Sequence, residues 1–166
     1  MVRLRGQCLK RLLALLLCVF TAACLCSCYI GADAKPRRQE RKTALKVFKY
    51  IKNENIDKLV DLFAEDTKDN YDVEEEWEDF FDSIDGHIVS YGDLEVTASE
   101  VWFDHWKRTY TNMMVVYEDV VTDEGTVYKK LIYCHIIVDE DKDMVGINAF
   151  ELIDSDGESV AVVGGY

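Results

Sequence analysis

The stretch VYKKLIYCHIIV, residues Val127–Val138, is rich in β-branched and aromatic residues. Such a composition predicts a strand. Runs of the same character lie on either side of it, at Thr109–Glu118 and at Val145–Ile153. The polar stretches between the three runs, residues 122–125 and 139–143, are predicted turns. The second half of the chain is therefore predicted to be a meander of long antiparallel strands.

Two shorter strands are predicted before this meander. His87–Tyr91 follows a turn at Asp85-Gly86 and is predicted to be a short strand, with His87 exposed. In residues 94–99 apolar and polar side chains alternate, which indicates a strand that is buried on one face.

The first half of the chain has a helical period instead. Apolar residues recur at spacings of three and four in three segments, and Asn53-Glu54-Asn55 is a candidate cap for the second. The apolar positions are Ala44, Val47, Phe48 and Ile51, then Ile56, Leu59, Val60, Leu62 and Phe63, then Val73, Trp77, Phe80, Phe81 and Ile84. Helices followed by a meander predict an α+β domain, with three N-terminal helices packed on one face of an antiparallel sheet.

The N-terminus precedes this domain and has the layout of an export signal. Met1–Arg11 carries four basic residues and no acid, and Leu12–Ala32 is a run of 21 uncharged residues. As a helix, this run would also be long enough, at about 30 Å, to cross a bilayer. Length alone therefore leaves both a cleaved signal and a membrane span open.

The cysteines favour the cleaved signal. Five of the six lie at or before position 28, and Leu25-Cys26-Ser27-Cys28 resembles a bacterial lipobox, with Cys28 in the lipidated position. Two acyl chains on Cys28 would hold the protein lastingly at the membrane. The alternative is an uncleaved N-terminal anchor, and the basic cluster at residues 35–42 opposes export by the positive-inside rule. We nevertheless expect a lipid-anchored protein at the extracytoplasmic face of the cell membrane.

These features divide the chain into a lipoprotein signal peptide (1–27), a tether (28–38), an α+β domain (39–154) and a C-terminal tail (155–166). Removal of residues 1–27, which include four basic residues and no acidic ones, changes the formal net charge from −13 to −17. Such an acidic protein repels phosphate backbones, which argues against nucleic-acid binding. Cys134 is the only cysteine left after position 28, so the domain cannot contain an internal disulfide.

The chain also resembles a known family. The motifs that carry the resemblance are residues 46–63, Trp77-Glu-Asp-Phe-Phe81 leading into residues 84–91, and Val145-Gly-Ile147. They are similar to those of Gram-positive lipoproteins catalogued as domain of unknown function number 5104, over roughly residues 40–154. The resemblance implies a nuclear-transport-factor-2-like (cystatin-like) cone, in which a curved antiparallel sheet and three helices enclose a cavity. It supplies no catalytic residues.

Candidate binding residues follow from this expectation. They are the aromatic and histidine side chains Trp102, His105, Trp106, Tyr110, Tyr133 and His135. On its strand His135 alternates with the more apolar set Ile132, Cys134, Ile136 and Val138, so it is predicted to face a cavity or solvent together with Tyr133. Asp104 and His105 are adjacent, and on a strand they would point to opposite faces, so a surface turn is favoured over a catalytic pair.

No metal or cofactor is predicted. The three histidines share no ligand spacing, and the calcium-like run at Asp139, Asp141 and Asp143 lacks the turn glycine and the final glutamate. Two functional classes remain: a non-catalytic module that binds a small ligand or an envelope protein, and an isomerase or dehydratase with His135 or His105 as its base. The absence of a visible acid/base set favours the binding module.

Overall fold

The computed structural model describes residues 35–165 of the chain. Residues 39–166 form one compact unit, separate from the unit that contains residues 1–38. The predicted signal peptide, most of the tether and Cys28 lie outside the described residues. Within the described part of the chain, no helix is both long and apolar enough to span a bilayer.

The N-terminal helix covers residues 35–52. From Gln39 onward it belongs to the compact unit, and Ala44, Val47 and Ile51 on one of its faces are fully buried. This confirms the first predicted helix, which begins earlier than its apolar period indicated.

Three shorter helices follow, α2 (Ile56–Val60), α3 (Glu65–Asn70) and α4 (Val73–Asp82). The side chain of Asn55 accepts a hydrogen bond from Lys58 N and caps α2, as predicted. The helix α3 was not predicted, because its sequence EDTKDN has no apolar period and Thr67 is its only buried residue.

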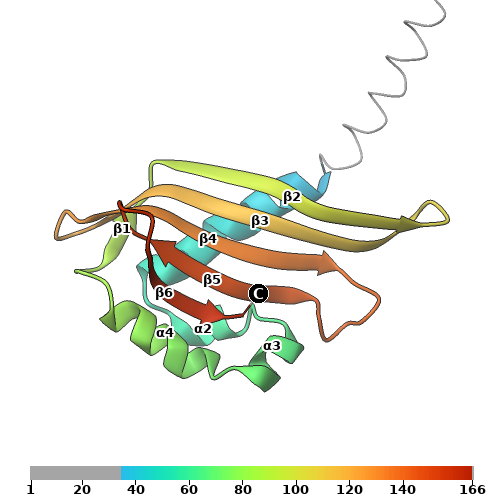
Figure 1. The fold of residues 1–166 in the computed structure, drawn as a ribbon, viewed down its shortest axis with the longest axis horizontal. Coiled ribbons are helices and arrows are strands. Elements are labelled where there is room, and N and C mark those ends of the chain that lie inside the picture. The colour runs from blue at the N-terminus through green and yellow to red at the C-terminus, as the bar shows by residue number, and fades with distance from the viewer. Residues whose placement is uncertain (1–34, 166) are drawn as a thin grey trace, which may run out of the picture. The chain divides into compact units, whose positions relative to one another are not determined.

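Six antiparallel strands form one curved sheet (Figure 1). The strands are β1 (Ile88–Ser90), β2 (Asp93–Asp104), β3 (Lys107–Thr122), β4 (Val127–Val138), β5 (Gly146–Ile153) and β6 (Ser159–Gly164). Their order is β1-β3-β4-β5-β6, and β2 pairs with β3 on the same side as β1. Register shifts interrupt all five strand pairings, and such irregularities add local bend to a sheet. The prediction of an α+β fold with an antiparallel sheet is confirmed.

The strand β6 corrects the expected C-terminal tail at residues 155–166. It pairs with β5 along its length and contacts α4, whose Glu76 Oε2 accepts a hydrogen bond from Gly164 N at 2.7 Å. The segment SVAVVG is short and consists of small residues, so its composition alone did not distinguish a strand from an irregular tail. The folded domain therefore extends beyond residue 154.

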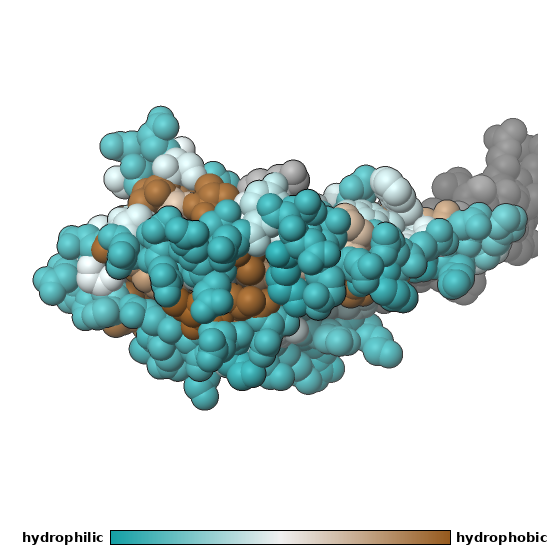
Figure 2. Space-filling view, turned by 90° about the horizontal axis from the view of Figure 1, so that it is seen from below, coloured by the Kyte–Doolittle hydropathy of each residue, from teal (hydrophilic) through white to brown (hydrophobic). Residues whose placement is uncertain are grey.

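Aromatic rings fill the interior between the helices and the sheet. Trp77 of α4 lies 4.9 Å, between ring centroids, from Phe150 of β5, and Phe150 lies 5.1 Å from Tyr133 of β4. All three side chains are fully buried. The face that carries α2 to α4 is mostly hydrophilic on the outside, with hydrophobic side chains visible in the gaps (Figure 2). Where the resemblance implied a cavity, this part of the structure is packed.

The packing also settles which side of β4 faces the core. Leu131 and Tyr133 are fully buried, whereas Ile132 and Cys134 are only partly buried. The residues that looked more apolar in the sequence (Ile132, Cys134, Ile136 and Val138) therefore lie mainly on the outer face of the sheet. The reason is that the tyrosine rings of Tyr117 and Tyr133 belong to the apolar core together with the N-terminal helix. A count of aliphatic residues along the strand leaves this contribution out.

Candidate functional site

The candidate binding residues lie in two separate places. Tyr133 and His135 lie beneath the N-terminal helix, whereas Trp102, His105, Trp106 and Tyr110 lie on the β2–β3 hairpin. His135 pairs with Met113 on β3, and Trp106 is seven residues from Met113 along the chain. At about 3.3 Å per residue, roughly 23 Å of strand separates Met113 from Trp106, whereas Tyr110 is only three residues from Met113. The structure thus places these residues in two regions, one beneath the N-terminal helix and one along the outer part of the β2–β3 hairpin.

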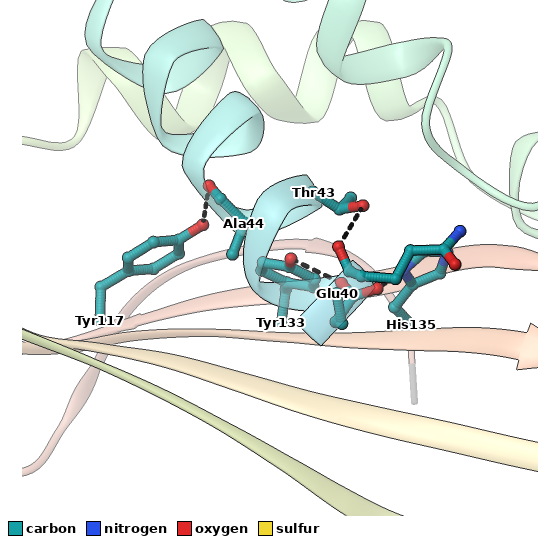
Figure 3. A network of polar contacts seen from close by, with 7 residues as sticks. Glu40, Thr43, Ala44, Tyr117, Tyr133 and His135 are labelled. Atoms are coloured by element: carbon teal, nitrogen blue, oxygen red, sulfur yellow. Dashed lines mark hydrogen bonds and ion pairs between the residues drawn. The ribbon is translucent and has the colours of Figure 1, made fainter. Parts of the chain in front are cut away.

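The first place is a buried polar cluster made of Glu40, Tyr133 and His135 (Figure 3). The Tyr133 hydroxyl donates to Glu40 Oε1 at 2.8 Å, and His135 Nδ1 lies 2.8 Å from Glu40 Oε2. The Glu40 side chain is only 2% exposed and that of His135 19%. Both carboxylate oxygens thus have a partner, which buried carboxylates require.

A fourth side chain, Tyr117 of β3, fastens the same helix one turn further on. Its hydroxyl donates to the carbonyl oxygen of Ala44 at 2.7 Å. Burial raises the pKa of Tyr117, and burial followed by the charges of Tyr117 and Glu40 raises the pKa of Tyr133. Both phenols therefore stay protonated far into the alkaline range and remain hydrogen-bond donors.

The sequence does indicate that Glu40 is buried, although basic residues surround it. Glu40 is an acid among Arg37, Arg38, Arg41 and Lys42, and it precedes Ala44 by four residues and Val47 by seven. This spacing puts it on the buried face of the helix. An acid on an apolar helix face needs a partner from another element, and here the sheet supplies two.

The chemistry of this cluster is that of a carboxylate that orients an imidazole. If the carboxylate is ionised it can only accept, so Nδ1 of His135 carries the proton and Nε2 is left as the basic nitrogen. A general base needs that nitrogen within reach of a substrate. The His135 side chain is 19% exposed, whereas the side chain of Tyr133, two residues before it, is fully buried.

The second place is the tip of the β2–β3 hairpin. Asp104 pairs with Lys107, and the two residues between them, His105 (φ 43°) and Trp106 (φ 66°), both have left-handed backbone conformations. This is the geometry of a two-residue type I′ turn, which prefers Asn-Gly. Bulky residues with positive φ are strained, and such strain clusters at functional positions.

Aromatic side chains surround this turn. Trp102, Phe103 and Trp106 are 57%, 56% and 100% exposed. The ring of Trp102 lies 4.9 Å from that of Tyr110, and Arg108 Cζ lies 5.5 Å from the centre of the Phe103 ring. Burial raises the pKa of the Tyr110 phenol. We call Trp102, Phe103 and Trp106 together the aromatic tip.

The remaining candidate features are the two other histidines, a metal site and a surface hollow. His105 Nδ1 lies 2.7 Å from Asp104 Oδ1, but both side chains are exposed, in a surface turn as favoured. His87 is exposed, as predicted, and contacts Glu54, which raises the pKa of His87. Among the described residues no group of histidine, cysteine and acidic side chains is arranged to hold a metal ion. A hollow of about 480 Å³ beside α3 and α4 is lined by Lys68, Tyr71 and several acids, none of which was predicted.

The described part of the chain is thus an α+β domain with a curved antiparallel sheet, a filled interior, a buried glutamate–tyrosine–histidine cluster and an exposed aromatic hairpin. Residues 46–155 match the family described as Domain of unknown function (DUF5104). The match covers more than half of the chain, so the protein belongs to this family. A comparison with curated proteins gives no match.

Proposed function

We propose that the protein is an extracytoplasmic lipoprotein of the Gram-positive type, attached to the cell membrane by a diacylglyceryl group on Cys28, and that its domain is a non-catalytic binding module. The observation that carries the binding role is the aromatic tip. Monomeric proteins seldom expose several large aromatic side chains together unless these contact a partner. Three such side chains lie here within five residues of sequence.

The anchor has its own test, which is mass spectrometry of the membrane-extracted protein. We expect a mature N-terminal peptide that begins at Cys28 and carries a diacylglyceryl modification. The variant Cys28→Ser should lose the modification. A protein that still begins at Met1 would support the uncleaved anchor instead.

The binding role is tested with the purified domain, residues 35–166, and the envelope fraction of Gram-positive cells. We expect saturable binding that weakens at least about tenfold when Trp102 and Trp106 are both replaced by Ser, because exposed indoles dominate such contacts. The matched control is Val127→Ser, which removes an exposed apolar side chain where β4 begins, near Val121 and far from the tip. Equal binding by both variants contradicts the proposal.

We also infer that the domain is a nuclear-transport-factor-2-like (cystatin-like) cone. A curved antiparallel sheet and a helix fastened to it through Tyr117 and Ala44 support this inference (Figures 1 and 3). Comparison of an experimental structure with proteins of that fold tests it. A different strand order, or a helix on the other face of the sheet, contradicts it.

The second candidate function is an isomerase or dehydratase, and the contact between Glu40 and His135 is the observation that favours it. A carboxylate that orients an imidazole is a common general-base arrangement. His105 makes a similar contact with Asp104, but both of these side chains are exposed. A thermal-shift screen of small carbonyl compounds separates the two functions: a ligand that stabilises the domain but not its Glu40→Gln or His135→Gln variants would favour the enzyme.

A further inference from the structure

We propose that the aromatic tip inserts into the headgroup region of the bilayer that holds the lipid anchor, so that the domain contacts the membrane at a second point. This inference rests on the anchor and on the binding role proposed above, and it names the partner as lipid. Three observations carry it: the reach of the hairpin, the chemistry of its end and the place where the chain enters the compact unit.

The hairpin projects beyond the rest of the sheet. Thr111 and Val138 are the last paired residues of β3 and β4, whereas β2 and β3 continue to pair as far as Asp104 and Lys107. Four residues of β3 therefore extend past β4, which at about 3.3 Å each amounts to roughly 13 Å. The hairpin tip stands clear of the sheet (Figure 1).

Both faces of the hairpin carry aromatic rings. Trp102 packs on Tyr110, and Phe103, the next residue along the strand, packs with Arg108 on the other face. Trp106 occupies the end. A protein groove or sheet edge would cover one of these faces, whereas a bilayer surrounds an inserted tip on all sides. This difference favours lipid over a protein partner.

The composition of the tip suits the headgroup region. Tryptophan concentrates at the membrane–water interface because its ring is apolar and its N–H polar. Lys107 can approach lipid phosphates. Lys107 and Arg108 together balance the charges of Glu100 and Asp104, so residues 100–108 are formally neutral apart from His105. Removal of residues 1–27 leaves a formal net charge of −17, which an anionic bilayer repels, whereas the formally neutral residues 100–108 are not repelled in this way.

The chain enters the compact unit at the same end of the sheet. Glu40, the second residue of that unit, contacts His135 near the end of β4, and β4 ends beside the part of β3 that leads to the tip. Glu40 is twelve positions after Cys28. Their covalent reach is at most about 40 Å, and less where they are helical. This is enough for a lipid on Cys28 and a tip roughly 23 Å beyond His135 to meet one membrane.

The test uses the full lipidated protein in vesicles of phosphatidylcholine and phosphatidylglycerol. Trp77 is fully buried, so the difference in fluorescence between the wild type and the Trp102→Ser/Trp106→Ser variant reports the tip. We expect phosphatidylcholine brominated on its acyl chains to quench at least half of this difference signal. Acrylamide, which stays in the aqueous phase, should quench the difference signal at least threefold less than it quenches free tryptophan. Val127→Ser should quench as the wild type does, and circular dichroism should show both variants folded.

Every other outcome overturns the docking. A tip signal that acrylamide quenches freely means that the tip remains in water, and a signal that neither quencher reaches means that protein covers it. Flotation of the protein with the vesicles and the mass of the peptide that contains Cys28 show separately whether the lipid anchor is present. An anchored protein with a water-exposed tip overturns only the docking, whereas a protein without lipid on Cys28 overturns the anchor and the docking with it. Envelope binding without lipid quenching points to a protein partner.

Discussion

Oε2 of Glu40 lies 2.8 Å from Nδ1 of His135, although 95 positions separate the two residues in the sequence. Together with the hydrogen bond from Tyr133 to the other carboxylate oxygen, this contact fixes the beginning of the N-terminal helix on β4. The first residues of the compact unit are therefore held by a buried polar cluster as well as by apolar packing.

Replacement of Glu40 tests how much this cluster stabilises the fold. Glu40→Ala should lower the free energy of unfolding by about 2–4 kcal/mol, because it leaves Tyr133 and His135 without their partner. Glu40→Gln keeps the shape and should cost about 1–2 kcal/mol. Urea denaturation of residues 35–166 measures both.

The control is Glu78→Ala on the exposed face of α4, which should change the same quantity by less than about 0.5 kcal/mol. If Glu40→Ala behaved like this control, the buried cluster would not fasten the helix.

Alkaline pH should destabilise the domain through Tyr117 and Tyr133. Their pKa values are raised in the folded state, so above the ordinary tyrosine pKa of 10.0 the unfolded chain releases protons that the folded chain keeps. The stability they contribute is complete below that pH and falls above it, by about 1.4 kcal/mol per pH unit for each phenol. Denaturation at pH 9 to 11 measures the slope, and Tyr133→Phe should reduce it. An unchanged slope in that variant would show that Tyr133 titrates normally.

Phe150→Ala should remove the centre of the core. Its ring contacts Trp77, Tyr133 and Phe63, and the loss of a buried phenylalanine of this kind costs about 3–5 kcal/mol. The matched control is Phe103→Ala at the aromatic tip, whose ring is half exposed; we expect a loss below about 1 kcal/mol. Thermal and urea unfolding of both variants check this. Equal losses would mean that the tip is part of the folding core.

Gly146→Ala should be among the costliest small substitutions. The backbone of residues 63–64 lies against the start of β5, and a Cβ on Gly146 would come within 2.4 Å of Ala64 N, at a φ of 150°. We expect a loss of about 3 kcal/mol. Gly125 also has a positive φ but has no neighbouring atom within 4 Å, so Gly125→Ala should cost only about 1 kcal/mol. A smaller loss at position 146 than at position 125 would contradict this close approach.

The turn of the hairpin offers a test of function against stability. Replacing His105-Trp106 with Asn-Gly should raise the free energy of unfolding by about 1 kcal/mol, because Asn and Gly accept the left-handed conformations that this turn requires. The same change should weaken lipid quenching of the tip, since it removes Trp106. A variant that is less stable would show that the native turn residues are not strained.

Much of the fold followed from local pattern. The strand at Val127–Val138 has the predicted bounds, and the cap at Asn55, the helix rich in aromatic residues at Val73–Asp82 and the exposed His87 were all predicted, because each depends on neighbours in sequence. The helix α3 and the strand β6 were missed, because contacts from distant elements stabilise them. For α3, the backbone hydrogen bond from Asp66 to Asp143 is one such contact, and for β6 it is the pairing with β5.

The candidate site divides in the same way. The sequence by itself determined that the domain is α+β, that it resembles the family described as Domain of unknown function (DUF5104), and that an aromatic segment surrounds His105. Only the tertiary structure decided that Glu40 lies against Tyr133 and His135 and that the aromatic tip stands apart from them. The physical reason is that periodicity records which face of an element is buried, whereas the partner that a buried charge finds depends on how the chain packs across a hundred residues.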